Sequence, residues 1–481
     1  MSANASDPTA DERHDTSVPD SEEIFSWVQD LTAYAARGTQ TLDDRRSADY
    51  LCDKFREFGL TDIQVQEAES FNWHASYSQL EVGGTTFPHE PVMFSFDTGN
   101  APFTTGPDGI VAPIVDVGDG TQDDFAQVDV HGKIVLFDLR FIMPRSALLE
   151  VGEFIYDPHG TLDPADLDTA NPYVSTYEDV VGRAIKRGAA GFVAVLADYF
   201  DSDDIRTEYL EDITIPGLWV TKAVGADLRA ATAHGTSKAV LRLDGERRAT
   251  PARTVIGYLE GADTDTIMIQ SHHDSAWDGG VEDASGTAEV LALARHYSRI
   301  PQAERPKTLM FVLMDSHWTG YSAHEKFVET FITAADLPRR IVANITLEHI
   351  AKQAEVGADG QLKVFDRPEY RGIFENVSPA LKTVIDEAVT AQDLQRTIRL
   401  SADKLVPLIG ELPTDADLIY DAGVPTISLI SGPLYLYDKA DTIDLVHKPD
   451  LGPVARAFID IVNRVAQTPS ELIGSGEQSA R

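Results

Sequence analysis

The chain has 481 residues, more than one hydrophobic core ordinarily holds, so we expect two or three domains. Its hydrophobic fraction of 43% and charged fraction of 25% are typical of a soluble globular protein. The formal net charge of −38 argues against nucleic acid and against an anionic membrane surface as partners, because both are bound by basic patches.

The two ends of the chain predict tails rather than folded structure. Residues 1–20 are polar and acidic and lack the apolar segment of a secretion signal, so we predict a disordered acidic tail there and a second tail at residues 469–481. No apolar run reaches the ~18 residues that a membrane-spanning helix needs. The one cysteine, Cys52, excludes a disulfide framework, and together these features predict a cytoplasmic location.

Helical periodicity marks the start of the folded chain. Apolar residues recur at spacings of three and four over residues 24–35, which predicts an amphipathic helix. A second amphipathic stretch, residues 48–60, contains Gly59, a residue typical of helix C-termini. Residues 62–68 alternate like a strand. We assign residues 21–105 to the N-terminal part of an α/β domain.

A β-rich texture follows and predicts a compact β-rich module over residues 106–245. Its short apolar runs lie at residues 108–118, 132–141, 189–198 and 215–221, with one helical stretch at 177–190. Inside it, residues 142–176 form a long irregular stretch that carries Phe154, Tyr156 and Tyr173. A loop of that length is commonly functional, so it is either a lid over a site or an ordinary surface excursion.

The last segment, residues 250–468, predicts the main part of the α/β domain. Apolar strands without strict alternation are expected at residues 254–261, 266–274, 308–316, 340–350 and 424–432. Helical segments such as residues 283–300 separate them, so both faces of the sheet should be covered by helices. The predicted fold class is therefore α/β, a mixed sheet with helices on both faces, together with the β-rich module. Ligands of such sheets bind beyond the carboxyl ends of the strands.

Four of the predicted strands end in unusual polar residues. "SHHD" (271–274) is followed by Asp283 at a helix start, and the other ends carry "DSHW" (315–318), "EH" (348–349) and "PLYLYDKADT" (433–442). Imidazole and carboxylate together suit Zn²⁺, Mn²⁺ or Fe²⁺. Each residue alone has a plain structural explanation, such as a helix N-cap at Asp283. Their coincidence at one sheet edge favours a metal site.

These segments resemble the zinc-dependent aminopeptidases related to bacterial leucyl aminopeptidase, glutamate carboxypeptidase, glutaminyl cyclase and the transferrin receptor ectodomain. "SHHDS…VEDASGTAEVLALAR" is similar to the family's H-x-D and D-[DN]-x-S-G segments, and "PTDADLIYDAGVPTISL" to its S-D-H and G-[IV]-P segment. Residues 106–245 resemble the protease-associated domain that many members insert. The resemblance implies an aminopeptidase-like fold with that insert.

The resemblance also implies a ligand set. His272 matches the first metal histidine, and Asp274 matches the aspartate that orients it. Asp283 matches the metal-bridging aspartate, and Glu348 falls where the family has an aspartate ligand. These residues imply one divalent metal ion, Zn or Mn, with Fe as a further option.

The departures from the family pattern all concern its second metal. His317 stands at the general-base glutamate, Trp318 at a metal-binding glutamate and Tyr437 at the last histidine. Tryptophan cannot bind a metal ion, so we infer that the second metal site is lost. His273 and His349 are additional imidazoles that could serve as ligands.

Each altered residue has two interpretations. We expect His317 to act in acid–base chemistry, and the alternative is a ligand or a structural histidine. Tyr437 could donate a hydrogen bond to an oxyanion or simply pack at the edge of the site. Trp277 and Trp318 could hold a flat substrate or fill the volume of the missing metal site.

The sequence therefore predicts a metal-dependent hydrolase that cleaves an amide or related C–N bond of a small molecule or peptide, with Asp274, His317 and Tyr437 as its catalytic residues. Two alternatives stay open: a catalytically silent binding protein on the same fold, and a conventional dinuclear zinc aminopeptidase. The oligomeric state is open as well, with a homodimer among the options.

Overall fold

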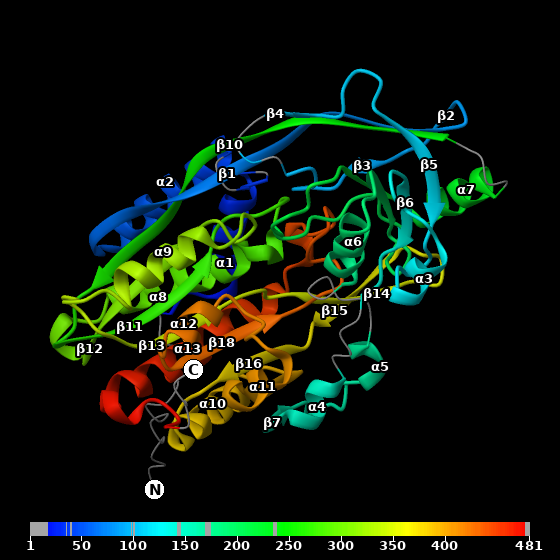
Figure 1. The fold of residues 1–481 in the computed structure, drawn as a ribbon. Helices are drawn as coiled ribbons and strands as arrows, with labels where there is room; N and C mark the ends of the chain where they lie inside the picture. Colours follow the sequence, from blue (N-terminus) through cyan, green and yellow to red (C-terminus); the bar gives the residue numbers. More distant parts are fainter. Residues whose placement is uncertain are drawn as a thin grey trace, which may run out of the picture.

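The structure, a computed structural model, describes residues 18–476 except 35, 39–40, 98, 100–101, 142–145, 169–174 and 234–237. One mixed sheet runs through the molecule in the order β3-β9-β8-β6-β5-β10-β12-β11-β13-β18-β16-β17-β7 (Figure 1). The strands are β1 (Thr61–Val82), β2 (Thr85–Thr86), β3 (Glu90–Pro91), β4 (Pro102–Thr104), β5 (Ile110–Asp116), β6 (Ile134–Asp138), β7 (Phe154–Tyr156), β8 (Gly191–Val195), β9 (Gly217–Val220), β10 (Lys238–Leu259), β11 (Asp263–His272), β12 (Lys307–Met314), β13 (Ile341–Leu347), β14 (Lys352–Val356), β15 (Leu362–Pro368), β16 (Arg371–Glu375), β17 (Thr397–Ser401) and β18 (Thr426–Ser431).

Helices cover both faces of the sheet in the main module, which comprises residues 250–468 with α1, α2 and part of β1. The α-helices are α1 (Ser21–Thr32), α2 (Leu42–Phe58), α3 (Gln122–Gln127), α4 (Ala147–Val151), α5 (Pro164–Leu167), α6 (Tyr177–Lys186), α7 (Lys222–Thr232), α8 (Gly286–Ser298), α9 (Ser322–Phe331), α10 (Pro379–Ala391), α11 (Ala402–Ile409), α12 (Asp417–Asp421) and α13 (Lys448–Gln467). Gly59 ends α2 in the left-handed conformation, at φ 82°, where a side chain would be strained.

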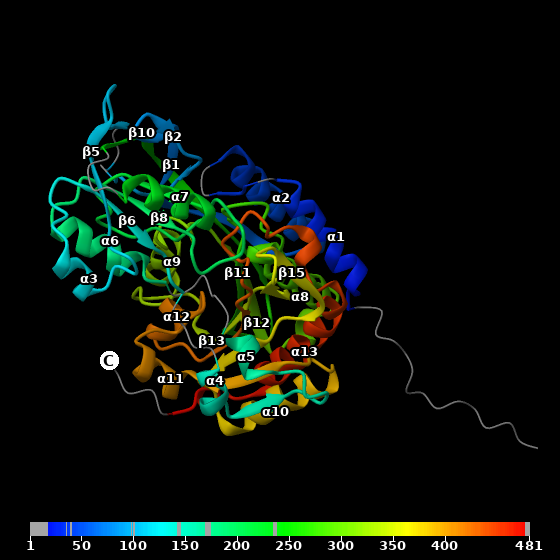
Figure 2. The same cartoon turned by 90° about the vertical axis from the view of Figure 1, so that its right-hand side faces the viewer.

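Alternating side chains of the central strands explain the two helical layers. Ile267 and Ile269 of β11 lie in the core that α1, α8 and α13 share, whereas Met268 points to the opposite core with Phe327 of α9. Figure 2 shows α1, α2, α8 and α13 on one side and α9, α11 and α12 on the other. Burial of each large apolar side chain contributes about 1.5–3 kcal/mol to the stability of the fold. Because such side chains are buried on both faces of the sheet, helices on each side stabilise the strands.

Parallel pairing brings the carboxyl ends of the central strands to one edge. β12, β11, β13 and β18 run parallel to one another in that spatial order. His272 at the end of β11 lies opposite Met314 at the end of β12, and Gln270 lies opposite Thr346 of β13. The polar residues that follow these strands therefore emerge side by side.

A long two-stranded ribbon joins the main module to the β-rich module, residues 106–245. β1 and β10 pair antiparallel from Thr61 opposite Tyr258 to Val82 opposite Ala239, and Figure 1 shows them running from one module into the other. Within the β-rich module, β5, β6, β8 and β9 form a parallel sheet. The predicted border near residue 245 thus falls inside the continuous strand β10.

One segment of the predicted insert belongs to the opposite edge of the sheet. Phe154–Tyr156 form β7, which pairs antiparallel with β17 of the main module. Glu153 next to it forms ion pairs with Lys382 and Arg399. The described part of the 142–176 stretch therefore extends the main sheet, and none of it lines the large cleft described below. Tyr173 lies outside the described residues.

Both ends of the described chain differ from the predicted tails. Residues 18–20 lead directly into α1, and residues 1–17 of the predicted acidic tail lie outside the described part. At the other end, Ile473 is fully buried and Gly474 pairs with Val377, so residues 469–476 pack on the main module rather than forming a tail. Within the part of the chain that the structure describes, every helix is too short or too polar to span a lipid bilayer.

Candidate active site

His272 occupies the carboxyl end of β11 and is fully buried. Its Nδ1 lies 3.3 Å from Oδ1 of Asp274, while Oδ2 of Asp274 accepts a hydrogen bond from the backbone N–H of Trp318. Residues two apart on an extended chain point the same way, which places the two side chains together. Asp274 thus fixes the ring of His272 so that Nε2 points away from it.

Glu282 lies at the centre of the site. Its Oε1 is 3.1 Å from Nε2 of His272 and 3.4 Å from Nε2 of His317, and its other oxygen contacts Nε2 of His349. The backbone N–H of Glu282 and that of the preceding residue donate to the carboxylate of Asp441, both at 2.9 Å. Sequence reasoning passed over Glu282, although it directly precedes Asp283 in "VEDASG".

His317 lies at the end of β12 and faces the same carboxylate. Its Nδ1 is 2.9 Å from Oδ1 of Asp415, and its ring stacks on that of His272 with centroids 4.2 Å apart and planes 9° apart. Oδ2 of Asp415 lies 4.0 Å from Nε2 of His272. Asp415 belongs to the "PTDAD" segment, but the sequence alone did not single it out.

The predicted ligands Asp283 and Glu348 lie at the site with different neighbours. Asp283 accepts hydrogen bonds from Oγ of Ser271 at 2.5 Å and from the backbone N–H groups of Gly286 and His349. One of its oxygens also lies within 4.8 Å of ring nitrogens of His272 and His349. Glu348 is buried and accepts from Oγ of Ser428 at 3.4 Å.

The two additional histidines take opposite directions. His349 points into the site, where its Nδ1 donates to the carbonyl of Ser431 at 2.7 Å and its Nε2 meets Glu282. His273 points to the other side of the strand, where its ring contacts Oγ of Ser47 and the carbonyl of Arg253. The two-residue period of an extended chain separates His273 from His272.

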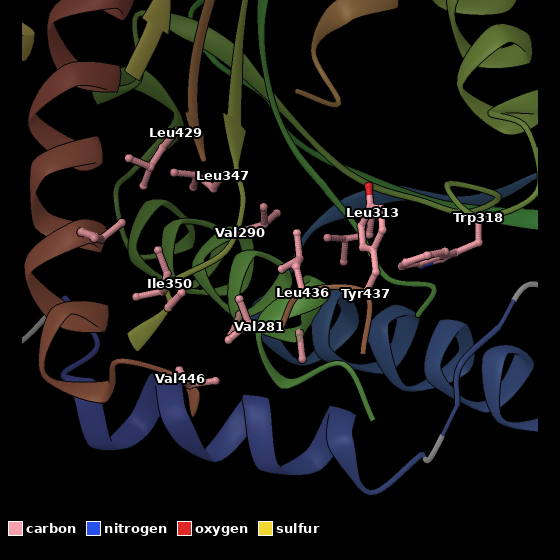
Figure 3. Packing of buried hydrophobic residues seen from close by; sticks show 14 of the residues in the cluster. Val281, Val290, Leu313, Trp318, Leu347, Ile350, Leu429, Leu436, Tyr437 and Val446 are labelled. Carbon is pink, nitrogen blue, oxygen red and sulfur yellow. The ribbon is translucent and has the colours of Figure 1, made fainter. Parts of the chain in front are cut away.

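The aromatic residues predicted near the site pack around it. Figure 3 shows the rings of Trp318 and Tyr437 side by side in the buried core, and their centroids are 4.8 Å apart. The guanidinium of Arg206 lies over the ring of Trp277 at 4.1 Å. Neither tryptophan lines the cleft in front of the histidines. The Tyr437 hydroxyl donates to Glu208 of the β-rich module at 2.5 Å.

A cleft of about 1580 Å³ opens onto this group of side chains. Its lining includes His317, Glu348 and His349 from the strand ends, Asp415 from the loop between α11 and α12, and Glu208 from the β-rich module. A cleft at the carboxyl edge of a parallel sheet is the usual ligand site of such folds.

Charge in the site is balanced between imidazoles and carboxylates. Burial disfavours a charged imidazole, but Asp415 raises the pKa of His317 to about 9 and Glu282 raises the pKa of His349 to about 10. Burial also disfavours a charged Glu282, yet His349 and His272 hold its pKa well below its usual range. A carboxylate among several imidazoles is the donor set that a divalent cation prefers, with the imidazoles then neutral.

Unfilled hydrogen-bonding capacity supports the fit to a cation. Within the described residues, no hydrogen bond of normal geometry reaches Nε2 of His272, Nε2 of His317, either carboxylate oxygen of Glu282 or Oδ2 of Asp415. Buried polar atoms nearly always have partners, so their gathering at one point calls for a ligand there.

Comparison with known proteins agrees with this geometry. Residues 254–462 match the family model of Peptidase family M28. This segment is a peptidase M28 domain. A search of curated proteins found no match to the chain.

Solved structures resemble nearly the whole chain. The aminopeptidase from Aneurinibacillus sp. strain AM-1 is 19% identical, with a TM-score of 0.59 and 96% of each chain covered. BSAP, a zinc aminopeptidase from Bacillus subtilis, is 16% identical, with a TM-score of 0.62, 96% of this chain and 100% of its own. A peptidase M28 precursor from Shewanella amazonensis SB2B is 19% identical, with a TM-score of 0.65 and 92% of each chain covered. At these identities the matches show a shared overall fold alone.

Proposed function

We propose that the chain is a metal-dependent hydrolase that cleaves an amide or related C–N bond of a peptide or a small molecule. The observation that carries this proposal is the convergence of Glu282 with three imidazoles at the floor of an open cleft. The M28 domain adds independent support, because that family is a peptidase family.

A single divalent ion fits the donor atoms best. Nε2 of His272, the carboxylate of Glu282 and Nε2 of His349 are the proposed ligands, with Asp283 and Glu348 close by. His317 is a poor partner for His272 on the same ion. The rings of His272 and His317 are stacked nearly parallel, so their Nε2 lone pairs do not point toward a common centre. A divalent cation bound there would polarise the scissile carbonyl and acidify a water molecule.

Two of the altered positions, Trp318 and Tyr437, are unsuited to hold a second ion, although His317 at the third lies near Glu282 and His272. Trp318 is 2% exposed and offers no ligand atom, while the Tyr437 hydroxyl is engaged with Glu208. Zinc is our first choice of metal, since BSAP is described as a zinc aminopeptidase, and manganese or iron would also suit these donors.

His317 is the proposed proton carrier. Asp415 holds its Nδ1, so its Nε2 faces the cleft in the arrangement of a carboxylate-oriented imidazole base. In the reaction a C–O bond forms between water and the substrate carbonyl and the C–N bond breaks. His317 takes one proton from the water and gives it to the leaving nitrogen. Tyr437 and Asp274 act as positioning residues for Glu208 and His272.

The experiment is a cycle of metal removal and return. The purified protein is treated with a chelator, reloaded with Zn²⁺, Mn²⁺ or Fe²⁺, and assayed on aminoacyl and acyl 4-nitroanilides. We expect hydrolysis to disappear with the metal and to return with one of the three ions. His272→Ala should stay inactive after reloading, whereas His159→Ala, at an exposed histidine of the 142–176 stretch, should behave like the wild type. Metal binding without turnover on any amide would favour a catalytically silent binding protein.

A further inference from the structure

A short loop, residues 273–279, joins the two proposed ligands His272 and Glu282. β11 ends at His272, and the turn that carries Glu282 begins at Gly280. Nε2 of His272 and Oε1 of Glu282 are 3.1 Å apart. Since the two side chains project from opposite ends of this loop, the path of the loop determines how their donor atoms converge.

Arg37, in the connection between α1 and α2, reaches into this loop and is fully buried. Its Nε donates to the carbonyl of His273, the first residue of the loop, at 3.0 Å. Its two terminal nitrogens donate to the carbonyls of Asp278 and Gly279 at 2.8 and 3.0 Å. A further bond of 3.0 Å goes to the carbonyl of Leu31 in α1. One guanidinium therefore ties the two ends of the loop to each other and to α1.

The loop also contacts Arg37 through its own backbone. The N–H of Ser275 donates to the carbonyl of Arg37 at 3.1 Å, and Oγ of Ser275 donates to the carbonyl of Trp277 at 3.0 Å. Gly279 adopts the left-handed conformation at φ 55°, and a Cβ there would lie 2.2 Å from the carbonyl oxygen of Glu282. The loop is thus folded tightly against Glu282 on one side and Arg37 on the other.

The guanidinium also brings positive charge to an acidic region. Burial lowers the pKa of Arg37 to about 10, and the charges of Asp441 and Asp274 act against this shift, so Arg37 is charged at neutral pH. Asp274 contacts Nδ1 of His272, and Asp441 holds the backbone of Glu282. A buried cation offsets part of the cost of burying these carboxylates.

Arg305 uses its guanidinium in the same way at a distance from the site. It is 9% exposed and donates to the carbonyl of Glu260 at 3.0 and 2.7 Å and to that of Tyr297 at 3.1 Å. Because Arg305 precedes β12, it lies at the amino ends of the parallel strands, opposite to the edge that carries the histidines. The chain thus offers a matched arginine with no role in the site.

We infer that Arg37 is a positioning residue for the metal site and holds residues 273–279 so that Nε2 of His272 and the carboxylate of Glu282 converge on one ion. The inference rests on the proposed function, because it concerns the ion that the hydrolase would use. Arg37 lies outside residues 254–462, the segment that matches the M28 family model. The N-terminal segment would therefore determine metal affinity as well as cover the sheet.

Replacement of the two arginines by lysine tests this directly. Lysine keeps the charge but has one ammonium in place of the five-donor planar fork. In Arg37→Lys the Kd for Zn²⁺, measured by competition with a chromophoric chelator, should rise about 10–100-fold, the usual effect of losing a group that orients a metal ligand. Arg305→Lys should bind Zn²⁺ like the wild type.

Urea unfolding of the metal-free proteins completes the comparison. Both variants should lose stability, because each loses hydrogen bonds to buried carbonyls. An unchanged Kd in a folded Arg37→Lys would overturn the inference. So would an equal rise in Kd in Arg37→Lys and Arg305→Lys, since that would mark a general loss of stability rather than positioning.

A milder variant decides the question if circular dichroism shows that Arg37→Lys does not fold. Ser275→Ala removes the Oγ bond to Trp277 and leaves Arg37 in place. The loop is then held less firmly, so Kd for Zn²⁺ should rise about threefold to tenfold, the equivalent of one hydrogen bond. Ser298→Ala, which loses a similar bond to Arg295 at the far end of α8, should match the wild type. Wild-type affinity in Ser275→Ala would then overturn the inference.

Metal binding and turnover separate this inference from the proposed function. If the wild type binds Zn²⁺ but hydrolyses no amide, and Arg37→Lys binds Zn²⁺ about tenfold more weakly, the role of Arg37 stands and the hydrolase proposal fails. If the wild type hydrolyses amides and Arg37→Lys binds Zn²⁺ with the same Kd, only the role of Arg37 fails.

Discussion

At the scale of single residues, Glu282 determines how the site is built. It is the carboxylate that meets His272, His317 and His349, and Asp441 fixes its backbone through two N–H groups. Asp283, one residue later, turns its oxygens toward backbone N–H groups and Ser271. Both acids lie near imidazoles, but only Asp283 also accepts hydrogen bonds from the turn, so we expect their roles to be separable.

Substitution of these two acids tests the assignment. Glu282→Gln should weaken metal binding by at least ~100-fold, because it removes a charged ligand rather than an outer partner. Asp283→Asn should keep the metal and lower the free energy of unfolding by about 1–3 kcal/mol, through lost hydrogen bonds in a buried turn. Elemental analysis measures the metal content of each variant, and denaturant unfolding measures its free energy of unfolding. The reverse pattern would make Asp283 the ligand, as the sequence predicted.

The role of His317 has its own test. His317→Gln should lower kcat by about 10²–10⁴-fold and leave the metal content unchanged, since its ring is stacked parallel to that of His272 and we propose it as a proton carrier. Steady-state kinetics and metal analysis of the same preparation check this. Loss of the metal in His317→Gln would instead make His317 a ligand.

At the scale of elements, β7 ties the 142–176 stretch to the sheet edge at β17. Glu153 beside it contacts Lys382, Arg399 and Lys404. Burial alone would raise the pKa of Glu153, but hydrogen bonds from these three cations lower it to about 2. A lowered folded-state pKa stabilises the fold above the ordinary value of 4.5, and the contribution fades as pH falls through about 2.

Glu153→Gln should therefore lower the free energy of unfolding by about 1–2 kcal/mol near pH 7, for a half-buried charge network. The difference from the wild type should narrow as the pH is lowered to about 4, where the unfolded glutamate is already largely protonated. Urea unfolding at both pH values measures it. A difference that does not depend on pH would show that the ion pairs contribute no stability.

At the scale of the whole molecule, sequence patterns predicted the central strands of the main module, whereas β16 and β17 were not predicted. Apolar runs located β11, β12, β13 and β18, and the polar residues after them correctly marked the strand ends. Glu208 gave no local signal, because a 201–216 loop from another module brings it to His317. The pairing of β7 with β17 was equally hidden, since it joins residues more than two hundred positions apart.

The shared ribbon of β1 and β10 also predicts how the molecule unfolds. Because the ribbon belongs to both modules, we expect one calorimetric transition rather than two. Metal at a thousandfold excess over Kd should increase the free energy of unfolding by about 4 kcal/mol and so raise the transition temperature. A chelator should lower the transition temperature. Two transitions of which only one responds to the chelator would mean that the modules unfold independently.

Metal stoichiometry tests the central claim most directly. Elemental analysis of the purified wild type, before any chelator, should find about one divalent ion per chain, as a single His272–Glu282–His349 site requires. Glu282→Gln prepared in parallel should hold almost none. Two ions per chain would contradict the account and indicate a dinuclear site, with His272, Glu282 and His317 as a second ligand group. No ion in the wild type would remove the basis for a metal-dependent hydrolase.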